Sequence, residues 1–269
     1  HAPLMAAAAG SGTGSPPLRA LCLHGWRTNA DLMRIQTARL RSVFGQGNID
    51  LVCANAPHLS PGPADASLES LVSGPYYEWW DAVDKSHEGP TYSGIDTSLQ
   101  SIWDLCETEG PFDVLVGFSQ GGIVATILSL ILANPEAARQ ASLPTPSEAA
   151  GRPWSSVVLV GSMLPRDPAL SALLQHRPAL PSFHLYGEAD MMFEQSKTLA
   201  AWWSESGHAV HRAQHPEGHR FPSDRAIYQR VSDFVHEHCP CEPHHQSAEA
   251  PASPSPPSQL SPSSGTSSL

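Results

Sequence analysis

The stretch Asp113-Val-Leu-Val-Gly-Phe-Ser-Gln-Gly-Gly-Ile-Val-Ala-Thr126 joins a short apolar run to helix-like sequence through a Gly-x-Ser-x-Gly motif. The β-branched run before Gly117 predicts a buried strand, and the apolar residues that recur after Gly121 predict a helix packed behind it. As a bare pattern the motif also occurs in flexible loops, so the flanking strand and helix decide the interpretation. A strand that turns directly into a helix at this motif is typical of a nucleophile elbow, with Ser119 at its tip.

The residue types around Ser119 fit that chemistry. Gly117 and Gly121 stand two residues to either side, where a tight turn leaves room only for small neighbours. The amide of Gln120 is then free at a helix N-terminus, where a carbonyl oxygen of a substrate would become an oxyanion. The motif therefore predicts a nucleophile together with half of an oxyanion hole.

Composition limits the class of protein. The chain has 269 residues and a single elbow, so we expect one domain. No uninterrupted apolar run reaches the ~20 residues that a membrane span needs. The net charge of −11 is spread without long runs, which argues against a nucleic-acid-binding surface. We therefore expect a soluble protein with a small-molecule substrate, no nucleic-acid partner and no membrane span.

The cysteines and the N-terminus bear on location. Cys22, Cys53 and Cys106 fall within apolar segments and show no disulfide-framework spacing, which favours a reducing compartment. No positive region followed by an apolar one marks a secretory signal, and the Ala/Gly/Ser run of residues 6–15 lacks the Arg of a transit peptide. We expect a cytoplasmic protein whose residues 1–17 form a disordered arm.

Strand and helix patterns alternate along residues 18–236. Strands are expected at 18–23, 51–54, 114–116, 157–160 and 183–186 and near Val210, and helices at 29–44, 95–106, 120–131, 196–203 and 224–235. This order predicts a three-layer α/β domain with helices on both faces of the sheet. Because the first strand comes so early, we expect a minimal, mostly parallel sheet of about six strands.

An insertion over residues 57–92 interrupts this alternation. It is rich in Pro, Gly, Ser and Asp and carries the aromatic cluster Tyr76-Tyr-Glu-Trp-Trp80. Long loops of this kind are often functional, so we expect Trp79 and Trp80 near the opening of the site, forming a substrate pocket with Met191. The alternative is a surface loop whose aromatics dock on the core.

The end of the chain, residues 237–269, is rich in Pro and Ser and is expected to be a disordered tail. A cluster of potential soft ligands lies at its beginning, comprising His236, His238, Cys239, Cys241, His244 and His245. No second Cys/His pair stands at the spacing of a structural zinc site. We therefore expect adventitious binding and no functional metal site.

A serine nucleophile needs a histidine base and a carboxylate that orients it. Asp190 follows the strand at 183–186 by a few residues and is the expected acid, with Glu188 as the alternative. His219 stands after the last strand, beside Gly218, which would permit a sharp turn, and is the expected base. His215 is the alternative base. The positions of His208 and His211 predict residues on the surface of a strand, and His24 comes too early in the chain order of nucleophile, acid and histidine.

The loop after the first strand is the natural source of the second oxyanion donor. Gly25 lets the backbone approach closely, which leaves the amide of Trp26 or of Arg27 free. We favour Trp26.

Together these segments resemble the FSH family of serine hydrolases. The resemblance is carried by Leu21-Cys-Leu-His-Gly-Trp-Arg-Thr-Asn29, Pro111-Phe-Asp-Val-Leu-Val-Gly-Phe-Ser-Gln-Gly121, Tyr186-Gly-Glu-Ala-Asp190 and Gly218-His219, and it spans residues 18–235. Two residues depart from the family pattern: Glu217, where a second Gly is common, and Trp26, where another aromatic is usual. The resemblance implies an α/β-hydrolase fold and a cofactor-free hydrolase of carboxylic esters or thioesters. A non-catalytic binding module on the same fold is the alternative.

Overall fold

The computed structural model describes residues 16–85, 89–147 and 153–239, and its centre is a six-stranded parallel sheet. The strands lie in the order β10 (Val210–His215), β9 (Ser182–Gly187), β8 (Ser156–Val160), β7 (Val114–Phe118), β1 (Leu18–Leu23) and β2 (Ile49–Ala54). The predicted α/β class and the minimal parallel sheet are confirmed. Most of the expected disordered arm and tail lies outside the described residues.

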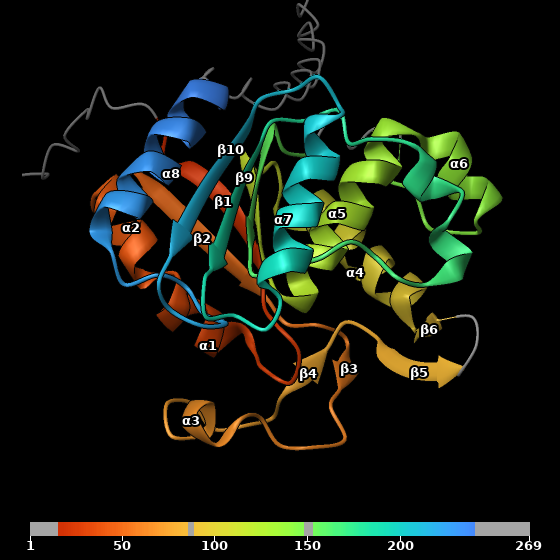
Figure 1. The fold of residues 1–269 in the computed structure, drawn as a ribbon, viewed down its shortest axis with the longest axis horizontal. Coiled ribbons are helices and arrows are strands. Elements are labelled where there is room, and N and C mark those ends of the chain that lie inside the picture. The colour runs from red at the N-terminus through yellow and green to blue at the C-terminus, as the bar shows by residue number, and fades with distance from the viewer. Residues whose placement is uncertain (1–15, 86–88, 148–152, 240–269) are drawn as a thin grey trace, which may run out of the picture.

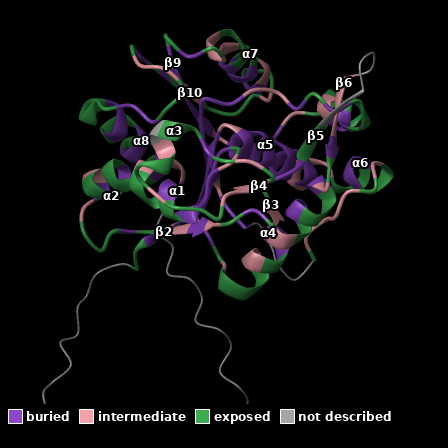
Figure 2. Ribbon diagram, turned by 90° about the horizontal axis from the view of Figure 1, so that it is seen from below, coloured by how far each residue is buried: buried purple, intermediate pink, exposed green. Residues whose placement is uncertain are grey.

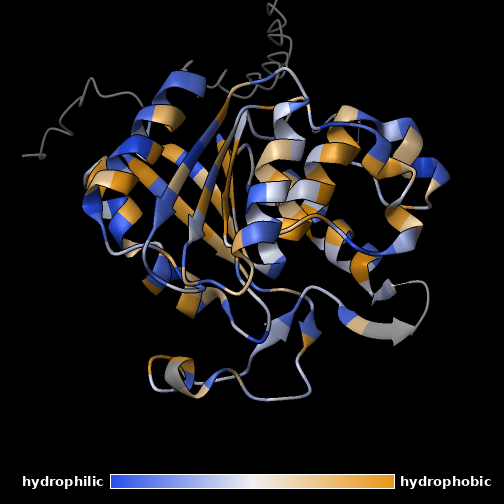
Figure 3. Ribbon diagram, viewed as in Figure 1, coloured by the Kyte–Doolittle hydropathy of each residue, from blue (hydrophilic) through white to orange (hydrophobic). Residues whose placement is uncertain are grey.

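Helices cover both faces of the sheet (Figure 1). On one face lie α1 (Ala30–Gln36), α2 (Ala38–Phe44) and α8 (Arg225–His238), and on the other lie α4 (Ile95–Glu109), α5 (Gln120–Ala133) and α7 (Phe193–Ser204). Successive side chains of a strand point to opposite faces, so Leu21 packs in one hydrophobic core and Cys22 in the other. Figure 2 shows the buried sheet between exposed outer helix surfaces, and Figure 3 shows apolar residues gathered on the same strands.

β7 and α5 form the centre of the molecule. Every residue of β7 is buried, and so is α5 from Gln120 to Ile131, because helices and strands enclose both. None of the helices in the described ranges is long and apolar enough to cross a bilayer. The elbow between β7 and α5 is thus held by well-packed elements on both sides.

Three local features differ from the sequence prediction. The single helix expected after the first strand is broken at Thr37, whose hydroxyl donates to the Met33 carbonyl at 2.7 Å. A short helix, α6 (Pro135–Gln140), lies in a region expected to be a connection, with Asn134 as its cap. α8 continues to His238, three residues beyond the expected end at Val235. Local side-chain bonds accompany the first two, since the Thr37 hydroxyl bonds to a carbonyl four residues earlier and the Asn134 side chain caps α6.

The insertion is more regular than its composition suggested. It forms two antiparallel pairs, β3 (His58–Leu59) with β4 (Tyr77–Glu78) and β5 (Asp81–Lys85) with β6 (Gly89–Ser93), and a short helix α3 (Ala66–Glu69). It lies beyond the carboxyl ends of the sheet strands (Figure 1). Trp79 and Trp80 are buried in the core, and Trp80 stacks on Tyr92 with ring centroids 4.2 Å apart. The docking of aromatics on the core, kept above as the alternative, is therefore what is found for these two side chains.

The elbow requires glycine for steric reasons. A Cβ on Gly121 would lie 2.3 Å from the Leu23 carbonyl oxygen, and one on Gly117 would lie 2.6 Å from the Gly121 carbonyl oxygen. Both obstacles are backbone atoms, which cannot rotate away as a side chain can. α5 can therefore pack against the end of β1 only when residue 121 has no side chain.

Replacing Gly121 by Ala is expected to lower the free energy of unfolding by about 1–3 kcal/mol or more, because β1 and α5 must separate to admit the methyl group. Urea unfolding measures the change. Gly218→Ala is the matched control, since its Cβ would meet only the Ala189 carbonyl oxygen at 3.6 Å, an ordinary contact. Equal stability of G121A and G218A would contradict the prediction.

Candidate active site

Ser119 occupies the tip of the turn between β7 and α5. Its φ of 53° and ψ of −116° are unfavourable for a residue with a side chain. The conformation is held from both sides, because the Ser119 amide donates to the Val160 carbonyl at 2.9 Å and the Ser119 carbonyl accepts from the amides of Gly122 and Ile123. Strain of this kind persists only where the surroundings fix the backbone, and it is common at functional sites.

The side chains of Ser119, His219 and Asp190 form one chain of contacts. His219 Nε2 lies 2.8 Å from Ser119 Oγ, and His219 Nδ1 lies 2.7 Å from Asp190 Oδ2. A carboxylate accepts only, so Nδ1 carries the proton and Nε2 is left to accept from the serine hydroxyl. The Asp190 side chain is 1% exposed while that of His219 is 33% exposed, which leaves the imidazole open to a substrate.

The loop after β9 fixes Asp190. One carboxylate oxygen faces His219, and the other accepts from the Met192 amide at 2.8 Å. Glu188, the alternative acid, is exposed, and its backbone amide is bonded to the His215 carbonyl at 2.7 Å. The structure therefore brings Asp190, and not Glu188, to the imidazole.

The loop that carries His219 is closed by Glu217, the residue that departs from the family pattern. Its carboxylate accepts from the Ser223 amide at 2.7 Å and from the Ser223 hydroxyl, and it pairs with Arg220 at 3.2 Å. Burial acts to raise the pKa of Glu217, but the bonds from Ser223 and the charge of Arg220 outweigh it and lower the pKa. Glu217 thus holds both ends of the turn around His219.

A different glycine from the expected one matters beside His219. Gly218 has no left-handed φ, so the freedom predicted for it is not used. Gly161 has a left-handed backbone, with a φ of 52°. A Cβ there would lie 3.0 Å from His219 Nδ1 and 3.3 Å from Asp190 Oδ2. The Phe118 ring packs against the imidazole on another side, with centroids 5.0 Å apart. The acid and base therefore meet above a residue that must lack a side chain.

His215, the alternative base, does not join this chain of contacts. It ends β10 and is 2% exposed, and within the described residues neither ring nitrogen has a hydrogen-bond partner. Burial lowers its pKa, which keeps the ring neutral. His208 is exposed and His211 is half-buried, and both lie far from Ser119 along the chain.

The two predicted oxyanion donors belong to segments that lie next to Ser119. Gln120 is the first residue of α5, so its amide has no carbonyl partner within the helix. On the other side, a Cβ on Gly25 would lie 3.4 Å from the Ser119 Cβ, which brings the loop after β1 next to the nucleophile. Trp26 follows directly. Both predicted oxyanion donors thus belong to segments in contact with Ser119.

The loop after β1 is fixed by His24, a residue set aside as a base. The Ala56 amide donates to His24 Nε2 at 3.0 Å, so the ring proton is on Nδ1, which donates to the Gly25 carbonyl at 2.7 Å. The ring is fully buried, and desolvation lowers its pKa to about 4 despite the opposing bond to Gly25. A neutral His24 therefore ties the loop of Gly25 and Trp26 to the chain after β2.

The side chain of Gln120 has a role that the motif did not indicate. Its Oε1 accepts from the Trp79 amide at 2.9 Å, and its Nε2 donates to the Trp80 carbonyl at 3.1 Å. Trp79 Nε1 in turn donates to the His24 carbonyl at 2.8 Å. The insertion, the elbow and the loop after β1 are thus bound to one another. The only sequence signal was a polar residue at the head of an otherwise apolar helix.

The residues predicted to line a substrate pocket lie in different environments. Trp79 and Trp80 are part of the core and do not reach the surface, because Gln120 draws their backbone inward. Met191 is 89% exposed, beside Asp190. The Trp26 ring is half exposed, donates from Nε1 to Glu78 at 2.9 Å, and has the Arg27 guanidinium 4.1 Å from its centroid.

The soft ligands at the end of the chain are separated. The His236 ring stacks on Phe44 at 5.2 Å and its Nδ1 contacts the Ser232 carbonyl at 2.8 Å. Cys239 Sγ is buried against the Ser156 hydroxyl and the Asp113 carbonyl, each at 3.2 Å. The other members at 241, 244 and 245 lie outside the described residues.

Comparison with known proteins agrees with this geometry. The family model described as "Serine hydrolase (FSH1)" matches residues 14–231. The chain is 29% identical to human "Esterase OVCA2" over 81% of its own length and 97% of that protein. It is 26% identical to "Hydrolase phiM" of Talaromyces stipitatus, covering 80% and 85% of the two chains. Among solved structures, esterase PE8 superposes with a TM-score of 0.53 at 20% identity, over 84% of this chain and 94% of the other.

Acid is expected to destabilise the fold through His24. Its pKa is about 4 in the folded protein against about 6.5 when unfolded, so the unfolded state binds more protons between these values and stability falls as pH falls through this window. From pH 7 to pH 5 His24 contributes about 2 kcal/mol to this loss by linkage, beside the contribution of His184, whose pKa burial lowers to about 3. Urea unfolding at both pH values measures it. A His24→Asn variant that shows the same pH dependence as the parent would contradict the assignment.

Proposed function

Because this chain belongs to the FSH1 family of serine hydrolases, we propose that it cleaves carboxylic esters through an acyl-enzyme formed on Ser119, and that acyl thioesters are a second substrate class. The observation that carries the proposal is the continuous contact from Ser119 Oγ to His219 at 2.8 Å and on to Asp190 at 2.7 Å. No cofactor enters the reaction.

In the first half of the proposed reaction, Ser119 Oγ attacks the ester carbonyl while His219 Nε2 takes the hydroxyl proton. Asp190 stabilises the imidazolium that forms, since its carboxylate is shielded from water and already bonded to Nδ1. His219 then gives the proton to the leaving alcohol or thiol. In the second half a water, activated by His219, hydrolyses the acyl-serine bond.

The amides of Gln120 and Trp26 are proposed to bind the oxyanion of the tetrahedral intermediate. Support comes from the position of Gln120 at the N-terminus of the 14-residue helix α5, where the helix dipole favours negative charge. The role proposed for the Trp26 amide is supported by its position directly after Gly25, which packs on Ser119. The loss of one preorganised donor of this kind lowers kcat about 10²–10³-fold.

We propose an apolar acyl group as the preferred substrate. Five large apolar side chains are exposed within the described residues, and four of them, Trp26, Leu59, Leu71 and Met191, belong to segments that follow the carboxyl ends of β1, β2 and β9. This is the edge of the sheet where Ser119 stands. Exposed apolar side chains that share one edge favour binding of hydrocarbon.

The rival function is a non-catalytic binding module on the same fold. Two features favour the enzyme. The Ser119 backbone keeps an unfavourable conformation that a binding protein has no need of, and the His219 nitrogen that faces Ser119 is the unprotonated one. The names of the relatives, "Esterase OVCA2" and "Hydrolase phiM", agree with catalysis.

We also propose that the enzyme works in the cytoplasm. Support comes from Cys22 and Cys53, which are packed in the apolar core as small hydrophobic residues and occur as free thiols. A reducing compartment preserves such thiols.

Replacing Ser119 by Ala is expected to lower kcat for p-nitrophenyl ester hydrolysis at least ~10³-fold, because the acyl-enzyme cannot form. A fluorophosphonate probe should label the parent protein and leave S119A unlabelled. The matched control is Ser171→Ala, which changes an exposed serine. Unchanged turnover by folded S119A would overturn the proposed mechanism. A protein that is silent to the probe but stabilised by apolar ligands would favour the binding module.

Replacing Met191 by Ala is expected to lower kcat/KM for an octanoyl ester about 10-fold while changing that for an acetyl ester less than about 2-fold, since each methylene that is buried contributes ~0.8 kcal/mol. A chain-length series of nitrophenyl esters gives the ratio. Ile35→Ala is the control, because Ile35 is the fifth exposed apolar residue and lies on α1. An equal ratio in both variants, or a parent that prefers acetate, would count against the apolar acyl site.

A further inference from the structure

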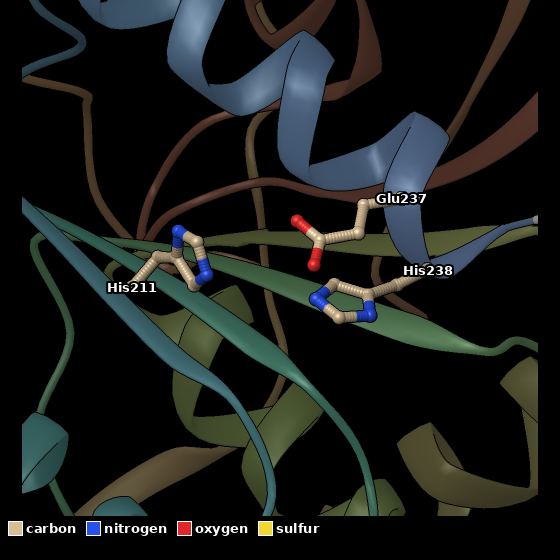
Figure 4. A group of neighbouring side chains, drawn as sticks. All are labelled: His211, Glu237 and His238. Carbon is tan, nitrogen blue, oxygen red and sulfur yellow. The ribbon is translucent and has the colours of Figure 1, made fainter.

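Three potential metal ligands from distant parts of the chain meet at the far end of the domain. His211 lies near the beginning of β10, and Glu237 and His238 lie in the last turn of α8. One ligand atom from each lies within 4.8 Å of the others. Figure 4 shows the Glu237 carboxylate directed toward the two imidazoles. We propose that His211, Glu237 and His238 bind a zinc ion.

The ligand types select the metal. Two imidazoles and one carboxylate are a donor set that Zn²⁺ uses, whereas Ca²⁺ and Mg²⁺ are bound by oxygen ligands. Zinc bonds of 2.0–2.2 Å place tetrahedral ligands about 3.4 Å apart, so the side chains need to close by roughly 1 Å. Glu237 is exposed and His211 and His238 are half-buried, so side-chain rotation supplies this movement without a change of backbone.

One of the ligands lacks a partner. His238 Nε2 is shielded from solvent and makes no hydrogen bond among the described residues. A shielded nitrogen of this kind costs free energy unless something binds it. One side of the site is apolar, because Phe234 packs 4.8 Å from the His238 ring and 5.2 Å from the His211 ring. A zinc ion would satisfy the nitrogen within these walls.

The position of the site indicates a structural role. β10 runs from Val210 near the zinc ligands to His215, which precedes the loop of His219, so the two sites are at opposite ends of the strand. The metal would join the edge strand of the sheet to the last helix. We therefore assign it to stability and expect kcat of the ester reaction to change less than about 2-fold when zinc is removed.

Titration calorimetry with ZnCl₂ on the full chain tests the site, in a background with Cys241, His244 and His245 replaced by Ala so that the tail cannot chelate. One zinc per chain is expected, with affinity at least 10-fold weaker in His211→Ala and in His238→Ala. His236→Ala is the matched control, because His236 lies on the same helix but its ring faces Phe44. Zinc at 100-fold excess over Kd should raise Tm by on the order of 5 °C in the background and in H236A only.

Two other outcomes would overturn the assignment of zinc to His211, Glu237 and His238. Binding that vanishes in the tail-substituted background would place the zinc on the tail residues. Binding that persists equally in H211A and H238A would show that another set of ligands holds the ion. The readout is independent of ester hydrolysis, so an inactive enzyme that still binds zinc would overturn the proposed function and leave the metal site intact.

Discussion

The contact between Gly121 and the end of β1 is the constraint on which the remaining geometry depends. Because residue 121 has no side chain, the backbones of α5 and the end of β1 lie so close that a Cβ at this position would be 2.3 Å from the Leu23 carbonyl oxygen, and the turn just before it holds Ser119 at a φ of 53°. That conformation lifts the hydroxyl toward His219 and leaves the Gln120 amide at the positive end of the helix. Ser119, its contact with His219 and the Gln120 amide at the start of α5 thus all lie beside one close approach of two backbones.

Gln120 extends this constraint to the insertion. Its backbone follows Ser119 directly and its side chain binds the backbone of Trp79 and Trp80, while Trp79 Nε1 donates to the His24 carbonyl. The two loops that surround Ser119 therefore have common anchors. The Trp79-Trp80 pair acts here through its backbone and its bulk in the core, and the exposed apolar side chains near Ser119 come from other segments, such as that of Met191.

The sequence predicted what depends on local pattern. Runs of β-branched residues alternating with helical stripes predicted a parallel sheet, and the position of Asp190 and His219 after successive strands predicted that they would approach Ser119. It did not predict features that depend on distant partners. The burial of Trp79 follows from a bond to Gln120, 41 residues away. The meeting of His211 with Glu237 depends on how α8 packs on β10, and the requirement for glycine at 161 depends on where His219 arrives.

The order of the strands has a consequence for biosynthesis. β7 pairs with β1 and β8, so the segment of Ser119 is held between a strand made early and one made late. The Ser119 amide is bonded to Val160, and the base and acid come later still. A nascent chain that has emerged only as far as α5 therefore lacks the partners that fix the turn. The contacts of Ser119 with Val160 and His219, and of His219 with Asp190, can therefore form only after the later strands of the sheet have been synthesised.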